Sequence, residues 1–221
     1  FSSISWIGIG YAARKFSRFP LLQSWSKLLL SLGAQLPAIF MAAFYGVEVV
    51  GLFGLANGMV NMPMNLLGRS VAQVYYAEIA KYGKSRPDKI RKLSISIIKK
   101  MFFVGIIPMG AIMVAGPWMF SFVFGAEWHD AGVYARLLSI AILSGFITTP
   151  IAHCLNVLEM QGSQLFINVI RVVLVVVVFM ACKIIGLSSF VAIAIHSVAY
   201  ASFRIVVLSF ILIRLKQYQK F

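Results

Sequence analysis

Carboxylates are scarce in this sequence. Only 6 of its 221 residues are Asp or Glu, against 20 Lys and Arg, and charged residues of either sign make up 12% of the chain. No pair of carboxylates is placed for general acid–base chemistry, and neither a nucleophile motif nor a phosphate-cradling glycine loop occurs. The sequence therefore predicts a protein that is not an enzyme.

Apolar residues take the place of charge. They make up 61% of the chain, and the mean hydropathy of +0.91 is far above that of soluble domains. A helix rises about 1.5 Å per residue and must cross about 30 Å of hydrocarbon, so each span needs about 20 apolar residues. Six stretches meet this length: 24–44, 47–75, 101–124, 131–157, 163–182 and 187–213. None alternates in the manner of a membrane barrel, so we expect an all-α membrane protein with a six-transmembrane-helix lobe over 24–214.

Lys and Arg gather on one side of the predicted membrane. Fifteen of them lie before the first span, in the 77–100 connection or around the 215–221 tail, and Lys183 stands alone on the other side. Because basic loops stay in the cytoplasm, we expect both ends of this segment to be cytoplasmic, with 77–100 as a basic cytoplasmic loop in which helix resumes after Pro87. These residues flank apolar runs, so anionic membrane lipids are expected partners and nucleic acid is not. Residues 1–23 are expected to form an interfacial amphipathic linker, although 1–13 could also end a preceding span.

The cysteines, histidines and small residues are expected to serve helix packing and not a chemical reaction. The 2 Cys lie near opposite membrane faces, so no disulfide is expected, and the isolated histidines predict no metal site and no cofactor. Gly54 with Gly58, and Ala141 with Gly145, are spaced for close helix contact. Five prolines inside the predicted spans predict kinked helices: Pro37, Pro63, Pro108, Pro117 and Pro150.

Arginines interrupt the apolar runs. Arg69, Arg171 and Arg204 each lie about two turns inside the predicted inner surface, and Arg136 lies near the outer one. An arginine near the bilayer centre costs about 3 kcal/mol on insertion scales and usually faces a cavity or a partner, although snorkelling toward the surface is the alternative. No Asp or Glu lies in the middle of a span, so a cavity lined by these arginines should prefer an anionic ligand.

Asparagines form a second candidate group. Asn57, Asn61 and Asn65 recur every four residues and therefore line one stripe of a helix. Their amides are suited to sugar hydroxyls, and hydrogen bonding between helices is the alternative. We take these three residues, with Arg69, Arg171 and Arg204, as candidate substrate-binding residues.

Much of the chain resembles a known family. The stretches 19–37, 51–76, 122–139 and 149–161 look like the C-terminal half of bacterial lipid-linked polysaccharide flippases. These are the O-antigen-type transporters of the multidrug/oligosaccharidyl-lipid/polysaccharide exporter superfamily. The most specific piece is FG-x-x-W-x-x-AG, Phe124 to Gly132, in which Gly125 and Gly132 are expected to turn the chain and Trp128 to anchor it at the membrane interface.

The resemblance implies a two-lobe, MATE-like transporter that works by alternating access. Such proteins move an undecaprenyl-diphosphate-linked oligosaccharide from the cytoplasmic to the outer leaflet of the bacterial plasma membrane. This chain is then expected to be the second lobe, with a missing N-terminal six-helix lobe and a lipid-linked anionic oligosaccharide as partners and a polysaccharide polymerase as a further candidate.

Other readings stay open. A cation-coupled multidrug antiporter of the same superfamily would need a membrane-embedded carboxylate, which could lie in the other half of the protein. A lipid II or teichoic-type flippase differs only in the glycan. A membrane-embedded glycan polymerase or ligase should carry a large outer loop, and a scaffold that transports nothing is the remaining alternative.

Overall fold

The computed structural model describes residues 18–83 and 86–218, with side chains from residue 24 onward. This part of the chain is helical and holds no strand. The helices are α2 (Arg18–Tyr45), α3 (Val47–Tyr82), α4 (Pro87–Phe124), the 3-10 helix η2 (Ala126–Trp128), α5 (His129–Ala152), α6 (Cys154–Val157), α7 (Gln161–Ile185) and α8 (Ser189–Gln217). The protein is therefore an all-α membrane protein, as its hydropathy predicts.

Five spans within the described residues are long and apolar enough to cross a membrane: Ser24–Tyr45, Pro87–Phe124, Ala126–Val157, Gln161–Ile185 and Ser189–Gln217. Helix α3 covers the predicted stretch 47–75 but is not among them. Its asparagines, glycines and Arg69 lower the hydropathy of an otherwise apolar helix of 36 residues. Among these residues the three asparagines and Arg69 recur every four residues, so they fall on one side of the helix.

The basic loop predicted at 77–100 is mostly helical, and the helix expected to resume after Pro87 does so. Helix α3 continues to Tyr82 and α4 begins at Pro87, so four residues separate the two helices. Proline is favoured in the first turn of a helix, and Asp88 there complements the helix dipole. The added turns bury Ile79 and Ile90 completely. Lys and Arg on the opposite face had masked this apolar stripe in the hydropathy average.

The ends of this helical hairpin carry local polar contacts. Lys81 donates a hydrogen bond of 2.8 Å to Glu78, which holds the pKa of that carboxyl below its ordinary value.

The other predicted boundaries also shift. Helix α2 takes in the last residues of the predicted 1–23 linker, and α8 takes in the first of the 215–221 tail, where Leu215 is buried. Residues 1–17 and 219–221 lie outside the described residues.

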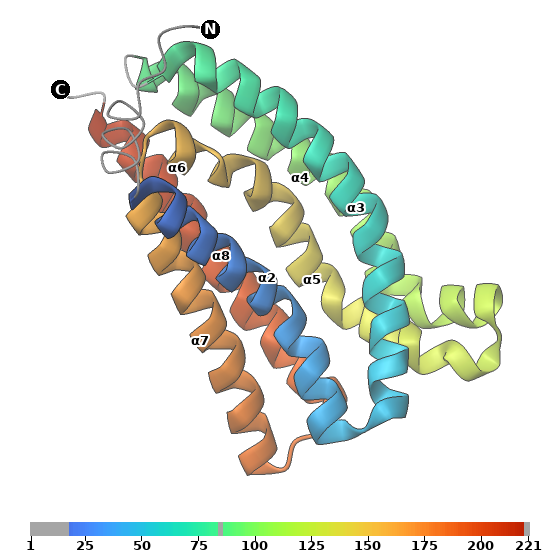
Figure 1. Cartoon of the computed structure of the whole chain (residues 1–221). Coiled ribbons are helices and arrows are strands. Elements are labelled where there is room, and N and C mark those ends of the chain that lie inside the picture. Colours follow the sequence, from blue (N-terminus) through green and yellow to red (C-terminus); the bar gives the residue numbers. More distant parts are fainter. Residues whose placement is uncertain (1–17, 84–85, 219–221) are drawn as a thin grey trace, which may run out of the picture.

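Helix α5 occupies the middle of the bundle. In its most apolar stretch 56% of the residues are buried, against at most 28% in the other four candidate spans. It packs against α3, α4 and α8, and α7 packs against α2 on the far side of α8 (Figure 1). Figure 1 also shows the start of α2, the α3–α4 connection and the end of α8 at one end of the bundle.

The FG-x-x-W-x-x-AG block begins in a turn, as expected, but Gly132 does not make one. Gly125 ends α4 with φ +108°, a conformation that favours glycine. Gly132 instead lies inside α5, where a Cβ would come within 2.5 Å of the Gly116 carbonyl oxygen. Its role is to let α4 and α5 approach closely. All five prolines predicted to lie within spans are inside helices.

A cationic cavity between α2, α3, α5, α7 and α8

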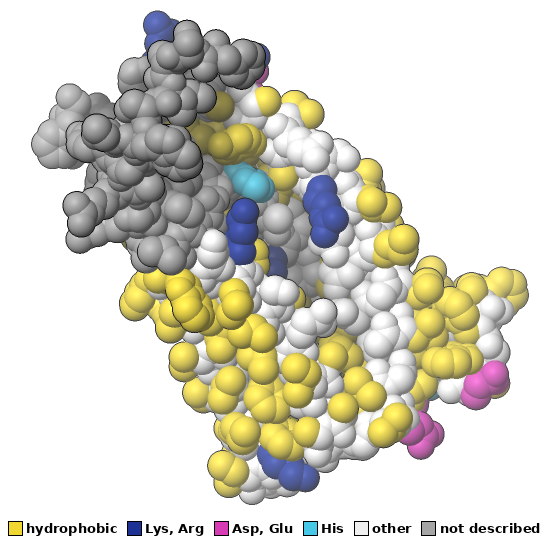
Figure 2. Space-filling model, in the orientation of Figure 1, with side chains coloured by type: hydrophobic (Ala, Val, Ile, Leu, Met, Phe, Trp, Pro, Cys, Tyr) yellow, Lys and Arg dark blue, Asp and Glu magenta, His cyan; other side chains and the backbone are white. Residues whose placement is uncertain are grey.

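A cavity of about 600 Å³ opens between the helices, in the size range of small-ligand sites, roughly 300–1,000 Å³. All six candidate substrate-binding residues line it: Asn57, Asn61, Asn65, Arg69, Arg171 and Arg204. Lys27 brings the lining to four cations, and no described lining residue is a carboxylate. Figure 2 shows Lys and Arg side chains around a hollow in the middle of one face.

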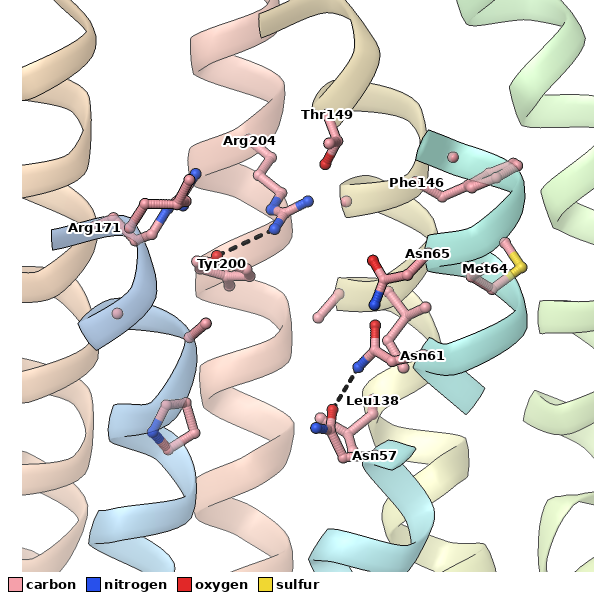
Figure 3. A pocket seen from close by; sticks show the side chains of 18 of the residues that line it. Asn57, Asn61, Met64, Asn65, Leu138, Phe146, Thr149, Arg171, Tyr200 and Arg204 are labelled. Atoms are coloured by element: carbon pink, nitrogen blue, oxygen red, sulfur yellow. Dashed lines mark hydrogen bonds between the residues drawn. The ribbon is translucent and has the colours of Figure 1, made fainter. Parts of the chain in front are cut away.

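Arg171 and Arg204 meet at one tyrosine. The Arg204 guanidinium lies 4.5 Å from the centre of the Tyr200 ring and donates a hydrogen bond of 3.1 Å to its hydroxyl. The Arg171 guanidinium, from the neighbouring helix, lies 5.8 Å from the same ring (Figure 3). We call Arg171, Tyr200 and Arg204 the arginine wall. Two positive charges placed so close together repel each other, and an anion between them would relieve that repulsion.

Each of the two guanidinium groups has an N–H donor without a partner among the described residues. The Nε atoms of Arg171 and Arg204 are buried and have no hydrogen-bond partner among the described residues. A buried donor without a partner costs about 1–3 kcal/mol, more when charged, unless a ligand or water satisfies it. Arginine offers five donors in a planar fork that matches carboxylate and phosphate oxygens. The arginine wall is therefore suited to bind an oxyanion.

Two glycines make room for these arginines. A Cβ built on Gly145 of α5 would lie 2.9 Å from Arg204 Cζ and still closer to one of its nitrogens. A Cβ built on Gly33 of α2 would lie 3.3 Å from Arg171 Cδ. The sequence predicts close helix contact at Ala141 and Gly145. At Gly145 the close neighbour is the Arg204 side chain.

An aromatic column holds Tyr200 in place. Its ring stacks on His196 at 5.4 Å, His196 lies 5.4 Å from Phe179, and Phe179 stacks on Phe40. The column runs from α8 through α7 to α2 and fixes the ring on which both arginines converge. His196 lines the cavity, and its Nδ1 is buried without a partner among the described residues.

The asparagines lie across the cavity from the arginine wall (Figure 3). Asn61 Nδ2 donates a short hydrogen bond of 2.5 Å to Asn57 Oδ1, and Asn65 bonds to no described residue. We call these three residues the asparagine wall. Among the described residues, no hydrogen bond joins the asparagine wall to another helix. Arg69 continues the stripe one turn further and is exposed.

Several other residues singled out in the sequence do not line the cavity. Arg136 donates a 2.9 Å hydrogen bond to the Val114 carbonyl of α4. Cys154 and Cys182 are both free and buried, and no metal-binding cluster occurs among the described residues. Gly54 and Gly58 have open space where a Cβ would lie, so the close helix contact predicted for them is absent from the described structure.

Sequence reasoning missed part of the arginine wall. His196, Tyr200 and Arg204 follow the same four-residue spacing as the asparagines, so a search for polar and aromatic residues at that period would have found the stripe. The convergence of Arg171 on Tyr200 depends on how α7 packs against α8 and has no signal within either helix.

These features define a multi-pass all-α membrane protein with a cationic cavity among its helices. Residues 4–133, more than half of the chain, match the family described as polysaccharide biosynthesis protein, and the chain belongs to that family. It is 26% identical over 138 residues to the teichuronic acid biosynthesis protein TuaB of Bacillus subtilis (strain 168). That match covers 62% of this chain but only 28% of the relative. No solved structure matches the chain significantly.

Proposed function

We propose that this chain is the C-terminal lobe of a flippase that moves an undecaprenyl-diphosphate-linked oligosaccharide across the bacterial plasma membrane. Cargo would be loaded from the cytoplasmic leaflet and released on the outer side by alternating access, with a second six-helix lobe completing the cavity. On this proposal both ends of the segment are cytoplasmic and the protein catalyses no covalent step.

One observation carries the proposal: Arg171 and Arg204 converge on Tyr200 in a cavity whose described lining has no carboxylate. A diphosphate is an oxyanion with several acceptor oxygens, and it joins the lipid to the sugar in this class of cargo. A cavity for a cationic drug would need the opposite charge. Membership of a polysaccharide biosynthesis family supports a glycan cargo, as does the name of the TuaB relative.

The test is a charge reversal in the complete protein. Arg204→Glu should lower the surface display of the glycan by about tenfold or more, because a charge-assisted hydrogen bond worth about 1.5–3 kcal/mol becomes a repulsion. Arg214→Glu is the matched control, since Arg214 is exposed near the end of the same helix and bonds to Gln217. Unchanged display in the Arg204 variant at equal protein level would contradict the proposal.

A further inference from the structure

The cavity has two unlike walls. Figure 3 shows the arginine wall on α7 and α8 facing the asparagine wall on α3. The first carries two permanent positive charges and a phenol, and the second carries three neutral amides. Leu138 and Phe146 of α5 also line the cavity and are buried and apolar. A ligand that fills the cavity therefore meets the two converging arginines on one side. On the other side it meets three neutral amides, with Arg69 one turn beyond them.

The two walls suit different parts of a glycolipid headgroup. Guanidinium groups have only donors, and they bind phosphate oxygens, which only accept. An asparagine amide has a donor and an acceptor side by side. A sugar hydroxyl likewise donates and accepts, so a row of amides pairs with a row of hydroxyls without requiring a charge.

The amides of the asparagine wall are available to a ligand. The bond from Asn61 to Asn57 uses one N–H of Asn61 and the oxygen of Asn57, and it leaves the other N–H of Asn61 and both of Asn57 unused within the described structure. Asn65 is exposed, lines the cavity and makes no hydrogen bond with a described residue. Polar groups kept in a membrane helix at this density, without a bond to another described helix, are functional candidates.

We propose that the asparagine wall is a sugar subsite, distinct from a phosphate subsite on the arginine wall. Helix α3 would then bind the saccharide, and α7 and α8 would bind the diphosphate. This inference rests on the proposed function, because it assumes a diphosphate-linked saccharide as cargo. A volume of about 600 Å³ admits the diphosphate and the first sugar more readily than a long glycan. The cavity would then discriminate between cargoes by the sugar next to the phosphate.

The experiment compares two ligands that differ only in the sugar. The methyl ester of geranylgeranyl diphosphate is the sugar-free lipid, and the same lipid with one N-acetylglucosamine in place of the methyl group has equal charge. Both are titrated into the complete protein in nanodiscs. The unmodified protein should bind the sugar-bearing lipid about tenfold more tightly, as expected for one or two added neutral hydrogen bonds. The combined change Asn61→Ala and Asn65→Ala should abolish this gain and leave the affinity for the sugar-free lipid within about twofold.

The arginine wall should give the opposite pattern. Arg204→Gln should weaken both lipids by about tenfold or more and preserve the gain from the sugar. Ser70→Ala is the control on α3, because Ser70 is exposed, bonds only to its own helix and does not line the cavity. It should preserve both affinities.

Three results would overturn the subsite proposal: no gain from the sugar in the unmodified protein, equal weakening of both lipids by the asparagine changes, or a gain that survives them. Failure of the unmodified protein to bind either lipid would instead refute the proposed function itself. Should the double variant unfold, the single change Asn65→Ala decides, since it removes no hydrogen bond seen within the described structure.

Discussion

At the scale of single residues, Arg204 depends on an absent side chain. The guanidinium group reaches Tyr200 only because residue 145 is glycine and leaves the surface of α5 open. Gly145 lines the cavity beside Arg204 and has no side chain to bind a ligand, so it is a positioning residue. Its substitution should act through the orientation of Arg204.

We predict that Gly145→Ala lowers glycan display about as strongly as Arg204→Gln. The added methyl group would overlap Arg204 and displace it from Tyr200, with loss of a charged hydrogen bond worth about 1.5–3 kcal/mol. Surface display of the glycan, normalised to protein level, is the measurement. Gly110→Ala is the control, since nothing lies within 4 Å of a Cβ at that position. Equal display in the two glycine variants would refute the positioning role.

Another residue-scale prediction concerns a buried hydroxyl. Ser94 donates to the Ile90 carbonyl, so Tyr75 donates to Ser94 Oγ at 2.6 Å, and its oxygen also lies 2.5 Å from Cys154 Sγ. Tyr75→Phe should lower the free energy of unfolding by about 1 kcal/mol. Thermal unfolding in detergent would measure the loss. Tyr76→Phe should be silent, because Tyr76 is exposed and keeps its ring contact with His153.

At the scale of elements, α3 and α4 differ most from expectation. An averaged hydropathy treats Lys89 to Lys100 as a solvated loop, although Ile90, Ser94 and Met101 fall on one buried face. The alternation of buried apolar and exposed basic residues has the helical period, and that period, more than the average, carries the structural information. The extended hairpin adds a second apolar core at one end of the bundle, shared with Ile211 and Leu215 of α8.

This hairpin can be tested by a core substitution inside the expected loop. Ile90 is fully buried, so Ile90→Ala should cost about 2–5 kcal/mol of stability. The neighbouring Lys92 is exposed, and Lys92→Ala should change stability by less than about 0.5 kcal/mol. Both values come from unfolding in detergent. A loop at this position would make the two substitutions equally mild.

At the scale of the whole molecule, the basic residues are unevenly distributed between the two ends of the helix bundle. Lys81, Arg86 and Lys216 lie near one end of the bundle, with the α3–α4 connection and the end of α8, whereas Lys183 ends α7 at the opposite end. The bias of basic residues predicts which end faces the cytoplasm, and accessibility of single cysteines from either side tests it.

We predict that Lys216→Cys is labelled by a membrane-impermeant maleimide only from the cytoplasm, and Lys183→Cys only from the outside. The unmodified chain is the control and should give no signal from Cys154 or Cys182, because both thiols are buried. Labelling of the two introduced cysteines from the same side would contradict the predicted topology.

The sequence predicts the class of fold and the polar residues of the cavity better than it predicts their contacts. Apolar length predicts most of the helices, and the period of four places Asn57, Asn61 and Asn65 on one face. The fit of Arg204 against Gly145, and the approach of Arg171 to Tyr200, arise between helices that are distant in the sequence. Such contacts depend on packing, which no periodicity within a single helix records.

The central position of α5 has a consequence for how such a protein could acquire a new cargo. This helix touches most of its neighbours, and small residues such as Ala135 and Ala141 are buried along it, so nearly any enlargement disturbs several interfaces at once. Asn65 of the asparagine wall and the adjoining Arg69 have no such constraint, because both are exposed and line the cavity. On the proposed function, divergence toward a different saccharide should therefore accumulate along α3, while α5 stays nearly invariant among members of the family.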